Sequence, residues 1–268
     1  MLKPCSDMVL EDSEEIGNKK VVLCRNKFYN KNMFCTNGHL LYGKNLMIDV
    51  IRKNLLFIQE QIAPYTPQII AVTKYFGVDA IIEAYGAGLR NFGESRALEA
   101  IEKINSLPNE IKMNSKFHFI GHLQTNKVNK VVCNFDVIHS VDSLKLAKSI
   151  SSEAEKVGKV QDVFVQLNNA NEEQKHGFSK EELFDCFEEI KNLKNIRVLG
   201  LMNIAPLEAD VNELEYLFDD VQKTQIELVN KFDCEMKEIS MGMSNDYQIA
   251  ATHGATMLRI GRKLFSTT

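Results

Sequence analysis

The sequence lacks any long apolar run, and no stretch approaches the roughly 20 apolar residues that a membrane-spanning helix needs. It also lacks an excess of positive charge: its net charge is −4 at pH 7, which argues against a broad surface for nucleic acid or anionic membranes. Its six cysteines include no C-x-x-C pair, a pattern typical of reduced, mostly buried thiols and not of a secreted disulfide framework. We therefore expect a cytoplasmic protein that binds neither nucleic acid nor membrane.

The first 44 residues show no sustained hydrophobic period. A mitochondrial transit peptide is rich in arginine and poor in acids, whereas this segment holds a single arginine, Arg25, and an acidic cluster from Glu11 to Glu15. A mitochondrial location is therefore a secondary alternative to the cytoplasm, and a secretory signal would need a longer apolar core. We expect residues 1–44 to form an extension that is partly disordered.

The stretch from Ile69 to Val72 is apolar and mostly β-branched, and it runs through Thr73 into Lys74 before a loop begins at Gly77. A short apolar run of this kind predicts a buried, parallel strand. A lysine at the end of such a strand is partly desolvated, which favours its neutral amine. The neutral amine is the form that attacks an aldehyde or ketone. Taken alone, Lys74 fits better a side chain that extends to solvent, but the rest of the chain reverses this preference.

From Leu46 to Ile62, apolar residues recur at helical spacing and predict a helix that ends near Pro64. After it, short apolar strands alternate with amphipathic helices. The expected strands are the one carrying Lys74, then 90–95, 116–121, 136–141, 163–167, 197–203, 238–241 and 257–260, and the helices between them are 78–87, 96–107, 124–132, 144–157, 180–193, 213–231 and 247–253. Repeated strand–helix units imply a parallel sheet. Eight units within this length imply a single (β/α)8 TIM barrel over residues 45–268, with an extra N-terminal helix.

In such barrels the functional residues lie at the C-terminal ends of the strands. Those positions hold Lys74, Glu94, Ser95, 121–126, Ser140, Asn168, Asn169, Met202, Asn203, 242–246 and 259–262. Phosphate sites in this fold use the loops after strands seven and eight. There, Gly242-Met-Ser244 opens a helix and offers a hydroxyl and free backbone N–H groups, and Gly261 permits close backbone approach. A lysine nucleophile and a phosphate pocket on one face suggest an aldehyde cofactor anchored by its phosphate.

Seven stretches along residues 46–265 match one family in order and register. They are Ala71-Val-Thr-Lys74, Asn91-Phe-Gly-Glu-Ser95, His118-Phe-Ile-Gly-His-Leu-Gln-Thr-Asn-Lys127, Lys175-His-Gly177, Gly200-Leu-Met202, Ser240-Met-Gly-Met-Ser-Asn-Asp246 and Gly254-Ala-Thr-Met-Leu-Arg-Ile-Gly261. In these stretches the chain resembles the pyridoxal-phosphate homeostasis proteins, which share the barrel domain of bacterial alanine racemases. The resemblance implies a barrel of the alanine racemase N-terminal-domain type. It also implies pyridoxal 5′-phosphate as the cofactor, held as a Schiff base by Lys74.

The resemblance further implies that Ser244, Gly261 and Arg262 surround the phosphate, Arg262 mostly through its backbone. It places Arg259 against the pyridine nitrogen. An arginine stays protonated and has no acceptor, so there it would keep that nitrogen unprotonated and weaken carbanion chemistry at the cofactor. Where the family has small residues after Gly261, this chain has Arg262 and Lys263, so the charge near the phosphate differs.

Three further residues complete the expected cofactor pocket: Ser95, Asn126 and Met202. The family usually has asparagine where this chain has Ser95, so a hydrogen bond to the cofactor is in question there. Asn126, together with Gln124, fits equally well a polar residue at the start of a helix.

His118 and His122 have the spacing of a metal pair, but a strand and a loop do not bring positions i and i+4 onto one face. We therefore expect no metal site. His118, which lies between Phe117 and Phe119, is expected to be a hydrogen-bonded residue of the barrel.

Three functions follow as alternatives: a carrier of pyridoxal 5′-phosphate, an amino-acid racemase that uses it, and a Schiff-base aldolase. Racemisation by two bases needs a proton donor on each face of the substrate. Lys74 supplies one, but the tyrosine that opposes it in alanine racemases comes from a carboxy-terminal β-domain, for which the sequence beyond Phe265 shows no source. We therefore expect a protein that serves intracellular vitamin B6 homeostasis and delivers the cofactor to apo pyridoxal-phosphate enzymes, without turnover of its own.

Overall fold

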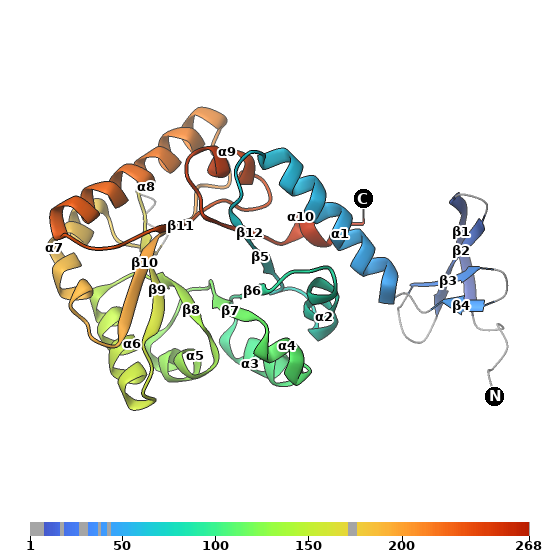
Figure 1. Cartoon of the computed structure of the whole chain (residues 1–268), viewed down its shortest axis with the longest axis horizontal. Coiled ribbons are helices and arrows are strands. Elements are labelled where there is room, and N and C mark those ends of the chain that lie inside the picture. The colour runs from blue at the N-terminus through green and yellow to red at the C-terminus, as the bar shows by residue number, and fades with distance from the viewer. Residues whose placement is uncertain are drawn as a thin grey trace. The chain divides into compact units, whose positions relative to one another are not determined.

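The computed structural model describes residues 8–16, 19–26, 32–36, 39–41, 44–170 and 176–267. The chain divides into two compact units, Met1–Val50 and Ile51–Thr268. The first unit contains an antiparallel sheet of four strands, which the sequence did not predict: β1 (Met8–Ile16), β2 (Lys19–Asn26), β3 (Asn32–Thr36) and β4 (His39–Leu41), in that order (Figure 1). Residues 1–44 were expected to form a partly disordered extension. Apart from these four strands and Lys44, that segment lies outside the described residues.

The second unit is a closed barrel of eight parallel strands, which confirms the predicted (β/α)8 fold. Its strands are β5 (Gln68–Val72), β6 (Asn91–Glu94), β7 (Lys116–Phe119), β8 (Val137–Val141), β9 (Gln161–Leu167), β10 (Ile196–Asn203), β11 (Glu238–Ser240) and β12 (Met257–Ile260). β12 pairs with β5, Arg259 opposite Ile70, and this pairing closes the barrel. The C-terminal ends of all eight strands therefore meet on one rim.

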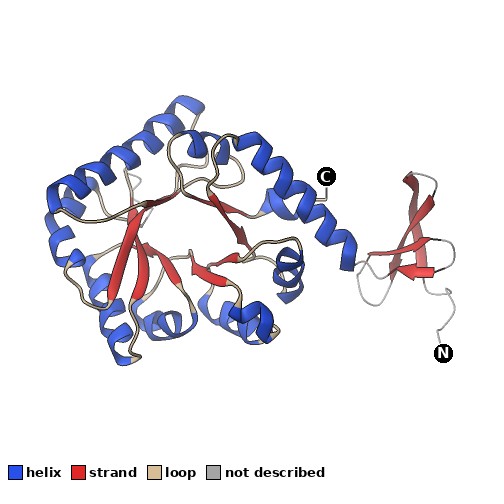
Figure 2. Cartoon of the chain, viewed as in Figure 1, coloured by secondary structure: helices blue, strands red, loops and turns tan. Residues whose placement is uncertain are grey.

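Helices form the outer layer around these strands (Figure 2). The long ones match the predicted segments within a few residues: α1 (Lys44–Ile62), α2 (Val78–Gly86), α3 (Ala97–Asn105), α5 (Val128–Asn134), α6 (Leu144–Lys156), α7 (Lys180–Lys191), α8 (Val211–Phe232) and α9 (Tyr247–Thr252). Two short helices were not predicted, α4 (Asn109–Met113) and α10 (Arg262–Phe265), and the predicted helix 124–132 begins with a 3-10 turn, η1 (Thr125–Lys127). No helix in the described part of the chain has the length and apolar character to cross a membrane.

Local side-chain chemistry explains several helix starts. Ser179 caps α7, accepting from the Glu182 backbone N–H while the Glu182 carboxylate accepts from the Ser179 N–H, a reciprocal pair that satisfies two otherwise free donors. Asp210 accepts from Glu213 N–H at the start of α8. Pro108 precedes α4 in extended backbone, and so the expected single helix 96–107 is followed by a separate turn of helix.

Candidate functional site

A cavity of about 610 Å³ opens at the C-terminal rim of the barrel, within the 300–1,000 Å³ usual for ligand sites. Most of its lining is apolar and comes from the strand ends and loops of β5, β7, β10, β11 and β12. The lining residues are Val72, Lys74, Tyr75, Phe76, Ile120, Ile204, Ala205, Pro206, Leu207, Ala209, Leu214, Met243, Ser244, Asn245, Asp246, Arg259, Gly261 and Arg262. The structure thus brings together five of the eight predicted site residues.

Lys74 is half-buried in this cavity, two residues after the end of β5 at Val72. Its Nζ lies 5.0 Å from the ring centroid of Tyr75, and no carboxylate of the described residues lies within 4.0 Å of it. A different lysine pairs with the buried acid Glu94: Lys103 Nζ donates to Glu94 Oε1 at 2.6 Å and to the Thr73 carbonyl at 3.0 Å. Thr73 Oγ1 donates to the same Glu94 oxygen at 2.7 Å. This network fixes the end of β5 and leaves the Lys74 amine without a carboxylate partner.

The loop after β11 lies against the start of α10 on the cavity wall. Lys263 N–H approaches Ser244 Oγ at 3.4 Å, and Arg262 Nη2 approaches Asn245 Oδ1 at the same distance. Among the described residues, no acceptor is recorded for the backbone N–H groups of Ser244 and Asn245. Gly261 passes so close to β5 that a Cβ there would lie 3.3 Å from the Val72 carbonyl oxygen. A hydroxyl, two free N–H groups and a nearby guanidinium are together suited to an anion.

Gly242 gives this loop its shape. Its φ of +87° is unfavourable for residues with a side chain, and a Cβ there would lie 2.5 Å from that of Ala250. The turn that follows is tied by Asp246, whose Oδ1 accepts from Met243 N–H at 2.5 Å. Burial raises the pKa of this carboxyl, and its hydrogen bond to the backbone acts in the opposite direction.

Arg259 lies in the cavity wall with only 4% of its surface exposed. Its Nη1 donates to the carbonyl and to the hydroxyl of Ser240, both at 2.7 Å, and its Nη2 donates to the Asn203 carbonyl at 2.7 Å. Burial lowers the pKa of the guanidinium to about 10, against the opposing effect of Asp246. The side chain therefore remains a cation at neutral pH, in one orientation.

A chain of buried hydrogen bonds continues from Arg259 through the barrel interior. Ser240 Oγ lies 2.9 Å from His139 Nδ1, His139 Nε2 lies 2.9 Å from His118 Nδ1, and His118 Nε2 lies 3.0 Å from Asn91 Oδ1. Burial lowers the pKa of His118 to about 3 and that of His139 well below its usual value, so both rings are neutral.

The tautomers of the two histidines follow from the ends of this chain. Asn91 Oδ1 can only accept, so His118 carries its proton on Nε2 and accepts on Nδ1. His139 then donates from Nε2 and accepts the Ser240 hydroxyl proton on Nδ1. Ser240 Oγ is left to accept from Arg259. The prediction for His118 is confirmed, whereas His139 was not singled out, because nothing local distinguishes a histidine that faces the barrel interior.

Three predicted site residues do not line the cavity. Met202 is fully buried in the barrel core, in a cluster with Ile70, Val137, Phe164 and Met257. Ser95 is half-buried, with its backbone packed so tightly against Gly121 that a Cβ at Gly121 would overlap it. Asn126 is exposed within η1. The cavity wall instead includes Tyr75, Phe76 and the loop 204–207, which the sequence did not single out.

Comparisons with known proteins identify a family model and relatives that this chain resembles. The family model for the N-terminal domain of alanine racemase matches residues 47–268. The pyridoxal phosphate homeostasis protein of Synechocystis sp. is 40% identical over 202 residues, which cover 75% of this chain and 92% of that protein. The human protein of the same name is 38% identical over 212 residues, covering 74% of this chain and 76% of that protein.

A solved structure shows the same barrel. PipY of Synechococcus elongatus PCC7942, determined with PLP bound, superposes with a TM-score of 0.73 at 35% identity. The match covers 81% of this chain and 100% of PipY.

Proposed function

We propose that this chain, which belongs to the family of the pyridoxal phosphate homeostasis proteins, binds pyridoxal 5′-phosphate in its rim cavity and attaches it covalently through Lys74. The observation that carries the proposal is the wall of a single cavity, which combines the Lys74 amine, the Ser244 loop and the Arg259 guanidinium. The naming of the relatives and the PLP bound to PipY support it.

The residues present fit this cofactor. When bound, pyridoxal 5′-phosphate supplies an aldehyde, which condenses reversibly with an amine and releases one water. Lys74 presents the amine from the end of β5, and no carboxylate in the described chain competes for it. Ser244, with the free N–H groups of Ser244 and Asn245, offers donors to a phosphate, and Arg262 adds positive charge at that end.

Arg259 sets the electronic character of the site. Its guanidinium has five N–H groups, and the contacts to Ser240 and Asn203 account for three hydrogen bonds. Donors remain for an acceptor in the cavity, and a guanidinium accepts no proton in return. A pyridine nitrogen facing Arg259 would therefore stay unprotonated, which makes the ring a poor electron sink. This disfavours racemisation.

We further propose that the protein serves vitamin B6 homeostasis by holding the cofactor and passing it to apo pyridoxal-phosphate enzymes. Such a role requires a ligand that can leave. Tyr75 and Leu207 in the cavity wall are 73% and 78% exposed, so solvent reaches the ligand-binding space directly. Water can then hydrolyse the bond to Lys74 and release the aldehyde.

Reductive trapping tests the attachment. Borohydride treatment of the cofactor-loaded protein should bleach its visible absorbance and fix the cofactor's mass on the peptide that contains Lys74. Lys74→Ala should lose both signals, although some cofactor anchored by its phosphate can remain. Lys127→Ala, which removes a half-buried lysine outside the cavity, should retain both. Label on any lysine other than Lys74 would refute the assignment.

A second experiment separates carrier from racemase. L-alanine incubated with loaded protein should give little D-alanine, because a ring nitrogen held unprotonated by Arg259 weakens carbanion chemistry at the cofactor. The same loaded protein should reactivate an apo pyridoxal-phosphate enzyme. Steady D-alanine production that disappears in Lys74→Ala would establish the racemase instead.

A further inference from the structure

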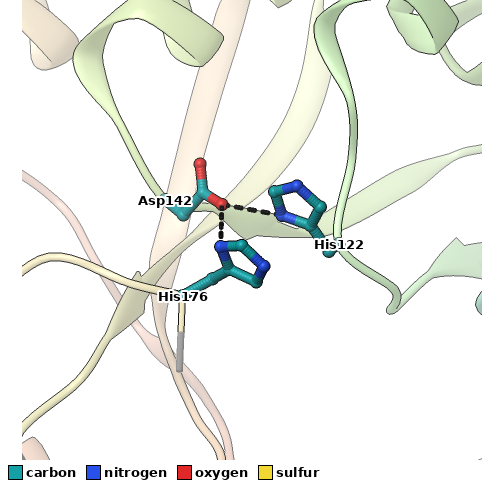
Figure 3. A group of neighbouring side chains, drawn as sticks. All are labelled: His122, Asp142 and His176. Atoms are coloured by element: carbon teal, nitrogen blue, oxygen red, sulfur yellow. Dashed lines mark hydrogen bonds and ion pairs between the residues drawn. The ribbon is translucent and has the colours of Figure 1, made fainter. Parts of the chain in front are cut away.

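Two histidines and an aspartate converge on the C-terminal rim, and none of the three is among the residues that line the cavity with Lys74. His122 follows β7, Asp142 follows β8, and His176 lies in the loop between β9 and α7. Figure 3 shows both imidazoles directed at one oxygen of Asp142. His122 Nδ1 lies 3.0 Å from Asp142 Oδ2 and His176 Nδ1 lies 3.8 Å from it, and the three ligand atoms lie within 4.8 Å of one another.

We propose that His122, Asp142 and His176 form a binding site for a divalent transition-metal ion of the zinc type. Imidazole nitrogens favour zinc, nickel, copper or iron over magnesium and calcium, which prefer oxygen ligands. Zinc–nitrogen and zinc–oxygen bonds of about 2.0–2.2 Å place tetrahedral ligand atoms about 3.3–3.6 Å apart. The two distances to Asp142 Oδ2, 3.0 and 3.8 Å, bracket that range, so rotation of the side chains without movement of the backbone suffices. Three protein ligands leave a fourth position for water.

The backbone and outer contacts hold these ligands in place. Asp142 is only 11% exposed, and its other carboxylate oxygen accepts from Ser143 Oγ at 3.3 Å, which leaves Oδ2 directed at the histidines. The His176 carbonyl accepts from Gln166 Nε2 at 2.7 Å, so the loop that carries this ligand is fixed to β9. Support of ligands by outer hydrogen bonds is usual in protein metal sites.

The two imidazoles are stacked, with centroids 3.6 Å apart and ring planes 10° apart. An ion bound by a ring nitrogen lies near the plane of that ring, so two parallel rings cannot share one ion without turning. His122 and His176 are 41% and 57% exposed, which leaves room for this rotation. Metal binding should therefore break the stack.

This site departs from the expectation that no metal site exists. The pair considered from the sequence, His118 and His122, does not form, because His118 is held in the buried chain by Asn91 and His139. His122 instead lies beside Asp142 and His176, on the loops after the next two strands. The sequence analysis missed this cluster because the three residues are far apart in the sequence.

Titration of Zn²⁺ into chelator-stripped, cofactor-free protein should show saturable binding of one ion per chain. Co²⁺ should give the visible absorbance of a low-symmetry, four-coordinate site. The ring-proton resonances of two histidines should shift as the stack opens. His122→Ala, His176→Ala and Asp142→Asn should each weaken Zn²⁺ binding on the order of 100-fold, the upper end of the loss seen on removing a supporting group.

The matched control is His253→Ala. His253 Nδ1 lies 2.8 Å from Asp219 Oδ1, an imidazole–carboxylate pair to which the described residues add no third ligand. Its loss should leave Zn²⁺ affinity unchanged, and so should Lys74→Ala, which makes the result independent of cofactor binding. Absence of saturable binding, or binding that survives all three ligand substitutions, would overturn the proposal.

Discussion

Acidification should destabilise the folded protein steeply, because two neutral histidines are buried inside the barrel. His118 and His139 are 1% and 0% exposed, and burial holds the pKa of His118 at about 3 and that of His139 well below its usual value. In the unfolded chain both should titrate near the ordinary value of about 6.5. Below that pH the unfolded state binds two protons that the folded state does not.

The sign and the size follow from proton linkage. Because the folded pKa values lie below the unfolded ones, the contribution of these histidines to stability is complete above pH ~6.5 and is lost as the pH falls. Each proton changes the free energy of unfolding by about 1.4 kcal/mol per pH unit, so the pair gives a slope of about 2.7. Between pH ~7.5 and ~5 the loss is about 4 kcal/mol, a large part of the 5–15 kcal/mol of a typical protein.

Urea unfolding followed by circular dichroism at several pH values in that range measures the slope. His118→Gln removes one of the two protons, so its slope should fall by about 1.4 kcal/mol per pH unit, whatever its stability at neutral pH. Phe187→Leu is the matched control: Phe187 is fully buried on α7 and has no titrating group, so the variant should be less stable with an unchanged slope.

The comparison rests on differences between variants, since other groups also titrate. Asp246, whose pKa is raised by burial, acts in the opposite sense and stabilises the fold on acidification. It is present in all three proteins. Equal slopes in the wild type and His118→Gln would refute the assignment of a neutral His118 in the barrel interior.

The remaining predictions concern a buried ion pair, the glycine that shapes the loop after β11, and Ser244 in the cavity wall. Lys103→Met should lower the free energy of unfolding by about 3–5 kcal/mol, because Glu94, 2% exposed, would lose its partner in a buried ion pair. Adding Glu94→Gln should recover part of the loss, and no recovery would contradict this cause. Gly242→Ala should cost about 2–4 kcal/mol, since positive φ and a contact of 2.5 Å with α9 act together. The control is Gly158→Ala, at φ +64° with no atom within 4 Å of the added Cβ, which should cost only the backbone strain. Equal urea midpoints for the two variants would rule out a steric contribution at Gly242. Ser244→Ala should weaken pyridoxal 5′-phosphate binding by about 1–3 kcal/mol in equilibrium titration, with little change in the melting temperature of the cofactor-free protein; unchanged affinity would remove Ser244 from the phosphate end.

The barrel could be predicted from the sequence because each of its strands and helices has a recognisable local pattern of apolar residues. Strands such as β5 are short apolar runs, and helices such as α6 and α8 repeat apolar residues at 3.6-residue spacing. Their strict alternation implies a parallel barrel. Lys74 and Ser244 could be placed on its C-terminal rim for the same reason, since each lies in the segment that follows a strand.

The local sequence pattern does not determine which side chains lie close together, because that depends on barrel closure and strand register. Met202 and Arg259 both lie at strand ends, yet one packs in the core and the other lines the cavity. His139 meets Ser240 across a separation of 101 residues, and His122 meets His176 from a different loop. These contacts depend on which strands become neighbours and which face each residue presents. Only the closed barrel determines both.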